Sequence, residues 1–241
     1  MSKFLFSMLS FLTLATVSCQ KSSVTPSTTT VPSVYKKIYG ATDMYVDGNY
    51  LVIKSTDQPD HKSPYYSGSK NEAYNGTNSN FQKNPNSIST QSLTFRIPLN
   101  PTKASSSSST PLGSIGISLN GVPFYNQYAG PSQPLTSEIN SFDQYNGHPQ
   151  MTGQYHYHVE PLYLTTNKGK DALLGFLLDG FPVYGPLENG KTLTDADLDA
   201  LHGHTGVTAD YPSGIYHYHT TADAPYINGD GFYGTPGTVS N

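Results

Sequence analysis

Cysteine and charge are both scarce in this chain of 241 residues. The single cysteine, Cys19, rules out an intramolecular disulfide, and charged residues make up 12% of the sequence, about half the roughly 25% that is usual. The net charge of −4 comes without a basic cluster, which argues against a nucleic-acid partner. Tryptophan is absent, whereas tyrosine (19), glycine (22) and proline (18) are abundant. This composition favours an exported, mainly β protein, because tyrosine suits the pleated, half-buried surface of a sheet.

Several motifs of known chemistry are missing as well. The chain has no G-x-S-x-G, no Walker loop and no H-E-x-x-H, which excludes the enzyme classes that carry those signatures. With one cysteine and four methionines, it lacks the soft sulfur ligands of a copper(I) chaperone. The eight histidines are therefore the side chains best suited to metal chemistry.

The N-terminus is typical of an export signal. Lys3 precedes an apolar stretch, Phe4 to Val17, that is too short to span a membrane. The next residues complete Thr16-Val17-Ser18-Cys19, which resembles the lipobox of bacterial lipoproteins. We therefore expect residues 1–19 to be a lipoprotein signal peptide and Cys19 to be lipidated. An ordinary signal peptide with an unmodified cysteine is the alternative.

The rest of the chain divides into a tether and a domain. Residues 20–35 are rich in Ser, Thr and Pro and lack a hydrophobic period, which is typical of a flexible tether. Residues 36–241 are numerous enough for one sizeable domain. We expect the protein to be exported and held by its lipid in a bacterial cell envelope, at the periplasmic or outer face of the outer membrane.

The tetrapeptide Tyr-His-Tyr-His occurs twice, at residues 155–158 and 216–219. Each copy ends a longer repeated segment, which begins with Asn/Asp-Gly-x-Pro-x-Tyr and continues with an aspartate and a Gly-His pair. Seven positions separate His148 from the first tetrapeptide and twelve separate His204 from the second, so the second copy carries an insertion. We predict one compact, mainly β domain with short helices, built from two similar halves about a pseudo-twofold axis.

The halves are expected at about 112–165 and 172–234. Hairpin turns are predicted at Asn120-Gly121 and Asp179-Gly180, because these dipeptides favour two-residue hairpins. Further predictions are strands over 48–55 and 92–98, an exposed loop over 104–110, and a capped helix over 194–201. The segment from Tyr35 onward is expected to add strands to the first half.

Residues two apart on a strand point to the same side, so each tetrapeptide offers two imidazoles on one face and two phenols on the other. The Gly-His loop can fold back and add a third imidazole. Each half then supplies a three-histidine set: His148, His156 and His158 in the first, and His204, His217 and His219 in the second. The phenols are expected to pack in the core. The sequence leaves open whether the imidazoles converge on one shared site or form two.

All-imidazole ligation suits zinc or copper, and also nickel or iron(II), and disfavours calcium and magnesium. Asp143 and Asp199 are expected to accept the second ring N–H of the histidines, or to act as ligands themselves. His61 is a further candidate for a hydrogen-bond partner of these histidines or for a metal ligand. Asp179 and Glu160 differ between the two copies, and either is a candidate general base beside a metal-bound water.

These motifs together resemble the YHYH-domain proteins. The resemblance is carried by Gly-Gln-Tyr-His-Tyr-His-Val-Glu-Pro, by Leu-Leu-Asp-Gly-Phe-Pro-Val-Tyr-Gly-Pro, and by Leu-Asp-x-x-x-Gly-His followed by Tyr-His-Tyr-His-Thr. It extends from about Lys54 to Gly234, and Pro59-Asp60-His61 resembles an N-terminal element of the family. The resemblance implies a YHYH domain and marks these residues as important, and it implies no particular activity.

Three functions are consistent with the sequence. The first is a cell-envelope protein that binds zinc or copper without catalysis. The second is a metal-dependent hydrolase or oxidoreductase with an open coordination position. The third is a module that binds a glycan or an envelope protein through its tyrosine-rich surface and uses its histidines structurally.

Overall fold

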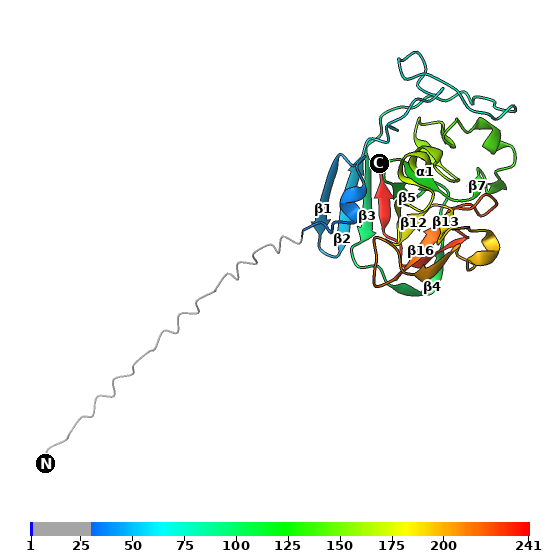
Figure 1. The fold of residues 1–241 in the computed structure, drawn as a ribbon. Coiled ribbons are helices and arrows are strands. Elements are labelled where there is room, and N and C mark those ends of the chain that lie inside the picture. The colour runs from blue at the N-terminus through cyan, green and yellow to red at the C-terminus, as the bar shows by residue number, and fades with distance from the viewer. Residues whose placement is uncertain (2–29) are drawn as a thin grey trace.

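The computed structural model describes Met1 and residues 30–241 (Figure 1). The predicted signal peptide, its Cys19 and most of the predicted tether lie outside the described residues. Within the described part, no helix has the length and apolar character needed to cross a membrane. Tyr35, the last residue of the predicted tether, is buried and packs against Phe176 with ring centroids 4.6 Å apart. The folded domain therefore includes it.

An eight-stranded sheet forms the centre of the fold, in the order β15-β16-β12-β11-β5-β6-β10-β9. Its strands are β5 (Ser114–Ser118), β6 (Pro123–Tyr125), β9 (Gly147–Pro149), β10 (Tyr155–Tyr157), β11 (Leu173–Leu177), β12 (Pro182–Tyr184), β15 (Gly203–Gly206) and β16 (Ile215–His219). The antiparallel pair β5 and β11 lies at the middle. Outward from it, each half adds its hairpin partner, its Tyr-His-Tyr-His strand and its Gly-His strand in the same order. The order is palindromic, which confirms the two similar halves and places the pseudo-twofold axis between β5 and β11.

Smaller elements also repeat between the halves. The first half has a short hairpin followed by a 3₁₀ turn: β7 (Tyr128–Ala129), β8 (Gln133–Pro134) and η2 (Glu138–Ser141). The second half has the same series: β13 (Leu187–Glu188), β14 (Lys191–Thr192) and η3 (Asp195–Asp197). The single α-helix in the described residues, α1 (Leu162–Lys168), joins the two halves and was not predicted.

Both predicted hairpin turns are present. Gly121 (φ +83°) and Gly180 (φ +85°) adopt the left-handed conformation that the Asn-Gly and Asp-Gly turns require. The predicted helix over 194–201 is reduced to η3. Its capping box between Thr194 and Asp197 is formed as expected. The helix stops at Asp197 because Leu198 is extended (φ −118°, ψ 162°).

A second sheet has four strands in the order β1-β2-β3-β18. They are β1 (Asp43–Asp47), β2 (Tyr50–Ser55), β3 (Leu93–Pro98) and β18 (Thr238–Ser240). The strands predicted over 48–55 and 92–98 are thus confirmed. The expectation that this N-terminal segment extends the first half is wrong, because its strands pair with one another and with the C-terminal strand β18.

The serine-rich segment over 104–110 is not the exposed loop that the sequence predicted. It forms β4 (Lys103–Ser109), which pairs with β17 (Gly231–Gly234) near the C-terminus. Its serines are mostly exposed, as predicted. The prediction of a loop is wrong because the pairing partner is distant in sequence and leaves no local signal.

The main core lies between the two larger sheets. Buried side chains of β2 and β3, such as Leu51 and Phe95, belong to one cluster with Ile117 and Phe176 of the central strands. All four tyrosines of the two tetrapeptides join this cluster, each no more than 4% exposed. The phenol face of each tetrapeptide therefore packs in the core, as predicted.

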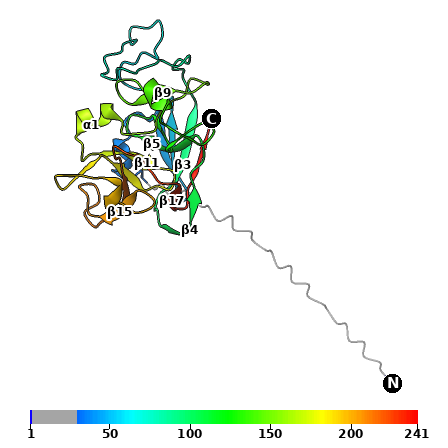
Figure 2. The same cartoon turned by 90° about the vertical axis from the view of Figure 1, so that its right-hand side faces the viewer.

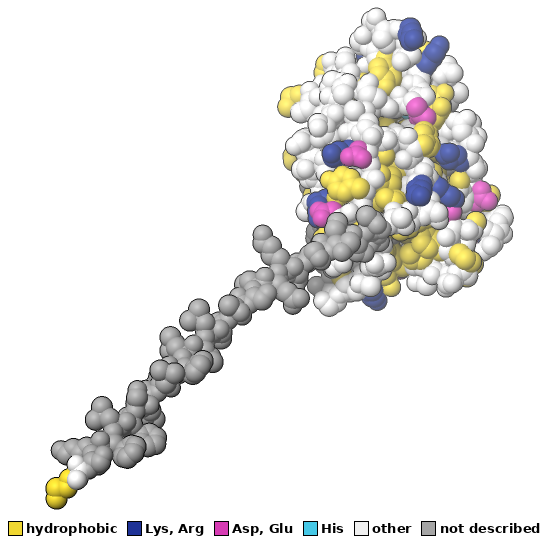
Figure 3. All heavy atoms as spheres, turned by 90° about the vertical axis from the view of Figure 1, so that its left-hand side faces the viewer, with side chains coloured by type: hydrophobic (Ala, Val, Ile, Leu, Met, Phe, Trp, Pro, Cys, Tyr) yellow, Lys and Arg dark blue, Asp and Glu magenta, His cyan; other side chains and the backbone are white. Residues whose placement is uncertain are grey.

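A long segment without strands, residues 56–92, lies over the first half (Figures 1 and 2). Its main chain bonds to that half, with the N–H of Gln82 donating to the carbonyl of Asn140 and the N–H of Ser89 to that of Gly153. On the face that carries β1 and β2, basic and acidic side chains are interspersed (Figure 3). Arg96 pairs there with Asp47 at 2.6 Å.

Candidate metal centres

Strand register brings the histidines together. On β10, His156 lies opposite His148 of β9, and on β16, His217 lies opposite His204 of β15. The second histidine of each tetrapeptide lies two residues further along the same face. The Gly-His pairs are thus in edge strands of the central sheet, where the sequence predicted loops that fold back.

The structure forms two separate centres rather than one shared site. The N-terminal centre consists of Glu138, His148, His156 and His158, and the C-terminal centre consists of Glu188, His204, His217 and His219. In each, one ligand atom from every residue lies within 4.8 Å of the others. All six histidines predicted from the sequence are included.

The N-terminal centre is compact and buried. The Nε2 atom of His156 lies 3.0 Å from the Nε2 atoms of both His148 and His158. The Oε1 of Glu138 lies 3.2 Å from Nε2 of His148 and 4.0 Å from that of His158. Four ligands at 2.0–2.1 Å from a tetrahedral zinc are about 3.3 Å apart, so these separations match such a donor set.

Hydrogen bonds at the Nδ1 atoms fix the tautomers in this centre. Nδ1 of His158 donates to the carbonyl of Asn126 (2.6 Å), and Nδ1 of His156 donates to that of Gln154 (3.1 Å). A carbonyl only accepts, so the proton of each ring is on Nδ1. Ser141 donates its proton to the carbonyl of Glu138 (2.7 Å) and so accepts from Nδ1 of His148 (2.7 Å). All three Nε2 atoms are left with bare lone pairs that face one another.

The C-terminal centre repeats this arrangement with small differences. Nε2 of His204 lies 3.2 Å from Nε2 of His219, and Glu188 lies 3.3 Å from His204 and 3.4 Å from His217. Nδ1 of His217 donates to the carbonyl of Ile215 (3.0 Å), and Nδ1 of His219 donates to that of Gly185 (2.8 Å). The side chain of His204 is 31% exposed, which makes this centre the more open of the two.

Burial favours the neutral form of the four tetrapeptide imidazoles. It lowers the pKa of His158 and that of His219 to about 4. It also lowers the pKa of His217, and it lowers that of His156 to well below 6.5. Neutral imidazole and ionised carboxylate are the forms that bind metal.

Aromatic rings pack against the histidines of both centres. Tyr125 stacks on His156 with ring centroids 3.8 Å apart, and Phe142 lies edge-on to His148 at 4.8 Å. In the second half, Tyr184 is edge-on to His217 at 5.3 Å. Such contacts restrict the rotamers of the histidines, so that the Nε2 atoms are preorganised.

Sequence reasoning missed the two glutamates. Glu138 is on the 3₁₀ turn η2 of the first half, and its counterpart in the second half is Thr194. Glu188 is on the short strand β13, and its counterpart is Ala129. Because the two carboxylates come from positions that do not correspond, a comparison of the repeats gave no signal for either.

The expected partners of the histidines, Asp143 and Asp199, have another role. Asp143 accepts hydrogen bonds from Tyr155 (2.8 Å) and Ser63 (2.6 Å), and Asp199 accepts one from Tyr216 (2.9 Å). They therefore bind the phenol face of the tetrapeptides. The expectation that they accept ring N–H groups is wrong, because backbone carbonyls and Ser141 take that role.

His61 is also on the phenol face. Its ring packs against those of Tyr145 and Tyr163, at centroid separations of 4.4 and 4.9 Å, and its Nε2 is 3.2 Å from the hydroxyl of Tyr157. Burial lowers its pKa. His61 is not part of either centre.

The two candidate general bases lie outside both centres. Asp179 is buried and accepts hydrogen bonds from the hydroxyl of Tyr218 (2.7 Å) and the N–H of Gly234 (2.9 Å), so it fixes the hairpin turn to the phenol face. Glu160 has a buried carboxylate oxygen without a hydrogen-bond partner, and it belongs to neither ligand group. A catalytic role for either at the centres is unsupported.

Taken together, the fold and the site define a duplicated, mainly β protein with one histidine–glutamate cluster in each half. The chain belongs to the YHYH protein family, whose model matches residues 94–195 and 187–231. The match confirms the resemblance found in the sequence. Neither a curated protein nor a solved structure matches the chain.

Proposed function

We propose that this protein is a cell-envelope lipoprotein that binds two transition-metal ions, zinc or copper, one in each half. The observation that carries the proposal is the convergence of bare Nε2 lone pairs at 3.0 Å in the N-terminal centre. Each of these neutral rings has one N–H proton, on Nδ1, and that proton is already donated to a carbonyl or to Ser141. No proton is left to form a hydrogen bond between the Nε2 atoms. A cation between the lone pairs converts this repulsion into coordination.

The donor set favours zinc or copper. Three neutral imidazoles with one carboxylate form a site of borderline softness, which suits these ions and not calcium or magnesium. Three histidines are also the protein ligands of some catalytic zinc sites, in which water takes a further position and the metal sometimes expands to five ligands. A metal-dependent hydrolase or oxidoreductase is therefore the second candidate, and it is supported by the cavities beside the centres, which His156, His158, His217 and His219 help to line.

Metal analysis of the full-length protein, purified without chelators, tests the proposal. We expect two ions per chain, and about one in each of two double variants, His156→Ala/His158→Ala and His217→Ala/His219→Ala. Matched controls are His61→Gln and His202→Gln, which change buried histidines that lie outside the centres. The controls should keep two ions. A wild-type protein that carries no ion and takes up none on titration with zinc or copper would leave the third candidate, a binding module with structural histidines.

The membrane anchor is supported by the sequence alone. The expected mature N-terminus is a lipidated Cys19, and its mass, together with partitioning of the protein into detergent, tests this. A water-soluble mature chain with an unmodified Cys19 would contradict it.

A further inference from the structure

A cavity lies beside each centre, and the two cavities occupy equivalent places in the two halves. The C-terminal cavity has a volume of about 940 Å³, and the N-terminal one about 560 Å³. Eight lining positions correspond between the halves: Leu112 with Asp171, Gly113 with Ala172, Ser114 with Leu173, Tyr125 with Tyr184, Tyr128 with Leu187, Gly130 with Asn189, His156 with His217, and His158 with His219. The cavities are therefore part of the framework that repeats between the halves. They differ in the other residues that line them.

The differences are concentrated in charge. The C-terminal cavity is lined by three lysines, Lys36 and Lys37 of η1 (Tyr35–Lys37) and Lys168 at the end of α1, and by three carboxylates, Asp171, Glu188 and Asp210. Among the described residues that line the N-terminal cavity there is no lysine or arginine, and Gln150 and Gln154 contribute neutral amides instead. Two cavities on one framework thus differ in the charge that they present to a ligand.

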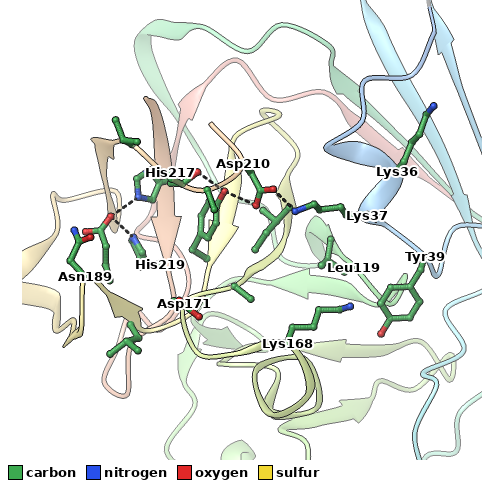
Figure 4. A pocket seen from close by; sticks show the side chains of 18 residues that line it. Lys36, Lys37, Tyr39, Leu119, Lys168, Asp171, Asn189, Asp210, His217 and His219 are labelled. Carbon is green, nitrogen blue, oxygen red and sulfur yellow. Dashed lines mark hydrogen bonds and ion pairs between the residues drawn. The ribbon is translucent and has the colours of Figure 1, made fainter. Parts of the chain in front are cut away.

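The insertion in the second repeat supplies part of this wall. Residues 207–210 line the cavity, and they belong to the longer connection between His204 and the second tetrapeptide. Asp210 forms an ion pair with Lys37 and accepts a hydrogen bond from Tyr184 (3.2 Å). The insertion thereby connects the lysine-bearing N-terminal turn to the tyrosine that contacts His217 (Figure 4).

Lys168 is free to meet a ligand. It is exposed, its ammonium lies 4.8 Å from the ring centroid of Tyr39, and it forms no ion pair with any residue that the structure describes. Figure 4 shows Lys168 and Tyr39 on the side of the cavity away from His217 and His219. Lys37 is neutralised by Asp210, whereas Lys168 is not, so Lys168 offers an available positive charge within the cavity.

We propose that the C-terminal cavity binds an organic oxyanion, a ligand with a carboxylate or phosphoryl group, between the metal of the C-terminal centre and Lys168. The inference rests on the proposed function, because the metal supplies one of the two anion contacts. The positive charge of the metal and of Lys168 selects a negative ligand, and Leu119, Leu173 and Val207 on the wall suit its apolar part. The N-terminal cavity, which is lined by Glu138 but by no lysine or arginine among the described residues, lacks the second contact.

The test uses full-length protein loaded with cobalt(II), whose visible spectrum reports changes in coordination. Inorganic phosphate and acetate are titrated separately, and their relative affinities distinguish a phosphoryl from a carboxylate site. We expect at least one of them to change the spectrum saturably. The response should survive in His156→Ala/His158→Ala and disappear in His217→Ala/His219→Ala.

The lysine is tested on its own. Lys168→Met should weaken the effective anion about tenfold without loss of cobalt, since a charge-assisted contact is removed. Lys168→Arg should retain most of the affinity. Lys70→Met, which removes an exposed lysine from the segment over the first half, is the matched control and should change nothing.

The outcomes separate the two proposals. If neither centre takes up cobalt, the proposed metal function itself fails. If both centres bind cobalt but neither anion changes the spectrum, the oxyanion inference fails alone. An anion response that is lost in the N-terminal double variant, or that is equally strong in Lys168→Met, also overturns the inference.

Discussion

The side chains of each Tyr-His-Tyr-His strand divide between two structural tasks. The tyrosines face the core, and three of the four donate hydrogen bonds to aspartates, as Tyr155 does to Asp143 and Tyr218 to Asp179. The histidines face the opposite side, where their Nδ1 protons are donated to backbone carbonyl oxygens. The alternation of the strand therefore couples the packing of the core to the geometry of the centre.

Removal of one phenol hydroxyl tests this division. We expect Tyr155→Phe to lower the free energy of unfolding by about 1–2 kcal/mol, because the buried carboxylate of Asp143 loses a donor. Tyr216→Phe should cost less, since its partner Asp199 is exposed. Denaturant titration measures both. Metal content should stay at two ions, and a loss of metal in Tyr155→Phe would contradict the separation of the two faces.

The buried carboxyl group of Asp57 lowers the free energy of unfolding at neutral pH, and a substitution can remove this cost. It is fully buried, and neither carboxylate oxygen has a hydrogen-bond partner among the residues that the structure describes. Burial raises its pKa well above the usual value and outweighs the opposite effect of the nearby backbone N–H of Tyr155. A raised folded-state pKa favours folding below the unfolded pKa of about 4, and this advantage is lost as the pH rises through the folded-state pKa. At neutral pH the burial of this carboxyl group therefore opposes folding.

We accordingly expect Asp57→Asn to stabilise the protein at pH 7 by about 1–3 kcal/mol, with a gain that shrinks toward pH 4. Asparagine also tolerates the left-handed backbone of this position (φ +53°). Thermal unfolding at the two pH values measures the effect. Asp47→Asn, at an exposed carboxylate, is the control. A destabilised Asp57→Asn at pH 7 would show that the carboxylate has a partner of its own.

Residue identities predicted the imidazoles but not the carboxylates. His148 and His204 were recognisable because the Gly-His pair recurs at corresponding places, and the two tetrapeptides follow from the period of a strand. Glu138 and Glu188 had no such signal, since each is matched by a residue that binds no metal in the other half. The roles of Asp143 and Asp199 were misassigned because spacing does not say which face of a strand a loop residue meets.

Among the elements, the central pair β5 and β11 joins the two halves. Gly116 and Gly175 occupy equivalent places on these strands, where a Cβ would lie 2.4 Å from the carbonyl oxygen of Phe176 and 2.2 Å from that of Ile117. Real Cβ atoms do not approach so closely, so both positions need glycine for the close pairing of the strands.

A methyl group at this contact should separate the halves. We expect Gly175→Ala to destabilise the protein by about 2 kcal/mol or more, because backbone atoms must move. Gly130→Ala is the control, since nothing lies within 4 Å of its added Cβ. The midpoint of unfolding in denaturant measures both. Equal midpoints for the two variants would contradict the role of the central pair.

The elements themselves were predictable to different degrees. The two hairpins were predicted from Asn120-Gly121 and Asp179-Gly180, since these dipeptides are typical of hairpin turns. Strand β4 was missed because its serines carry no hydrophobic alternation and its partner β17 is distant in sequence. Helix α1 was missed because it has only seven residues and no side-chain cap.

At the scale of the whole molecule, duplication produced two centres that are alike in their histidines and different in their surroundings. The palindromic sheet gives each half the same frame. The insertion at 207–210 and the N-terminal turn η1 then change only the second cavity. The repeated pattern in the sequence predicted the shared frame, whereas the assignment of a cavity wall to η1 depends on tertiary packing and was not predictable.

Metal removal should affect the stability of the entire domain. An ion that binds only the folded state stabilises it by about 2.7 kcal/mol when its free concentration is a hundred times the dissociation constant. We therefore expect a chelator to lower the melting temperature of the wild-type protein, and to lower that of each histidine double variant by less. A protein already stripped of metal should regain the higher value on addition of zinc.

The central claim is that three imidazoles and one carboxylate hold a metal in each half. Anomalous diffraction from a crystal of the metal-loaded protein, measured on both sides of the metal absorption edge, tests it most directly. The account predicts two peaks per chain, each about 2.0–2.2 Å from three histidine Nε2 atoms and a glutamate oxygen. The absence of both peaks, or peaks away from Glu138 and Glu188 and their histidines, would contradict it.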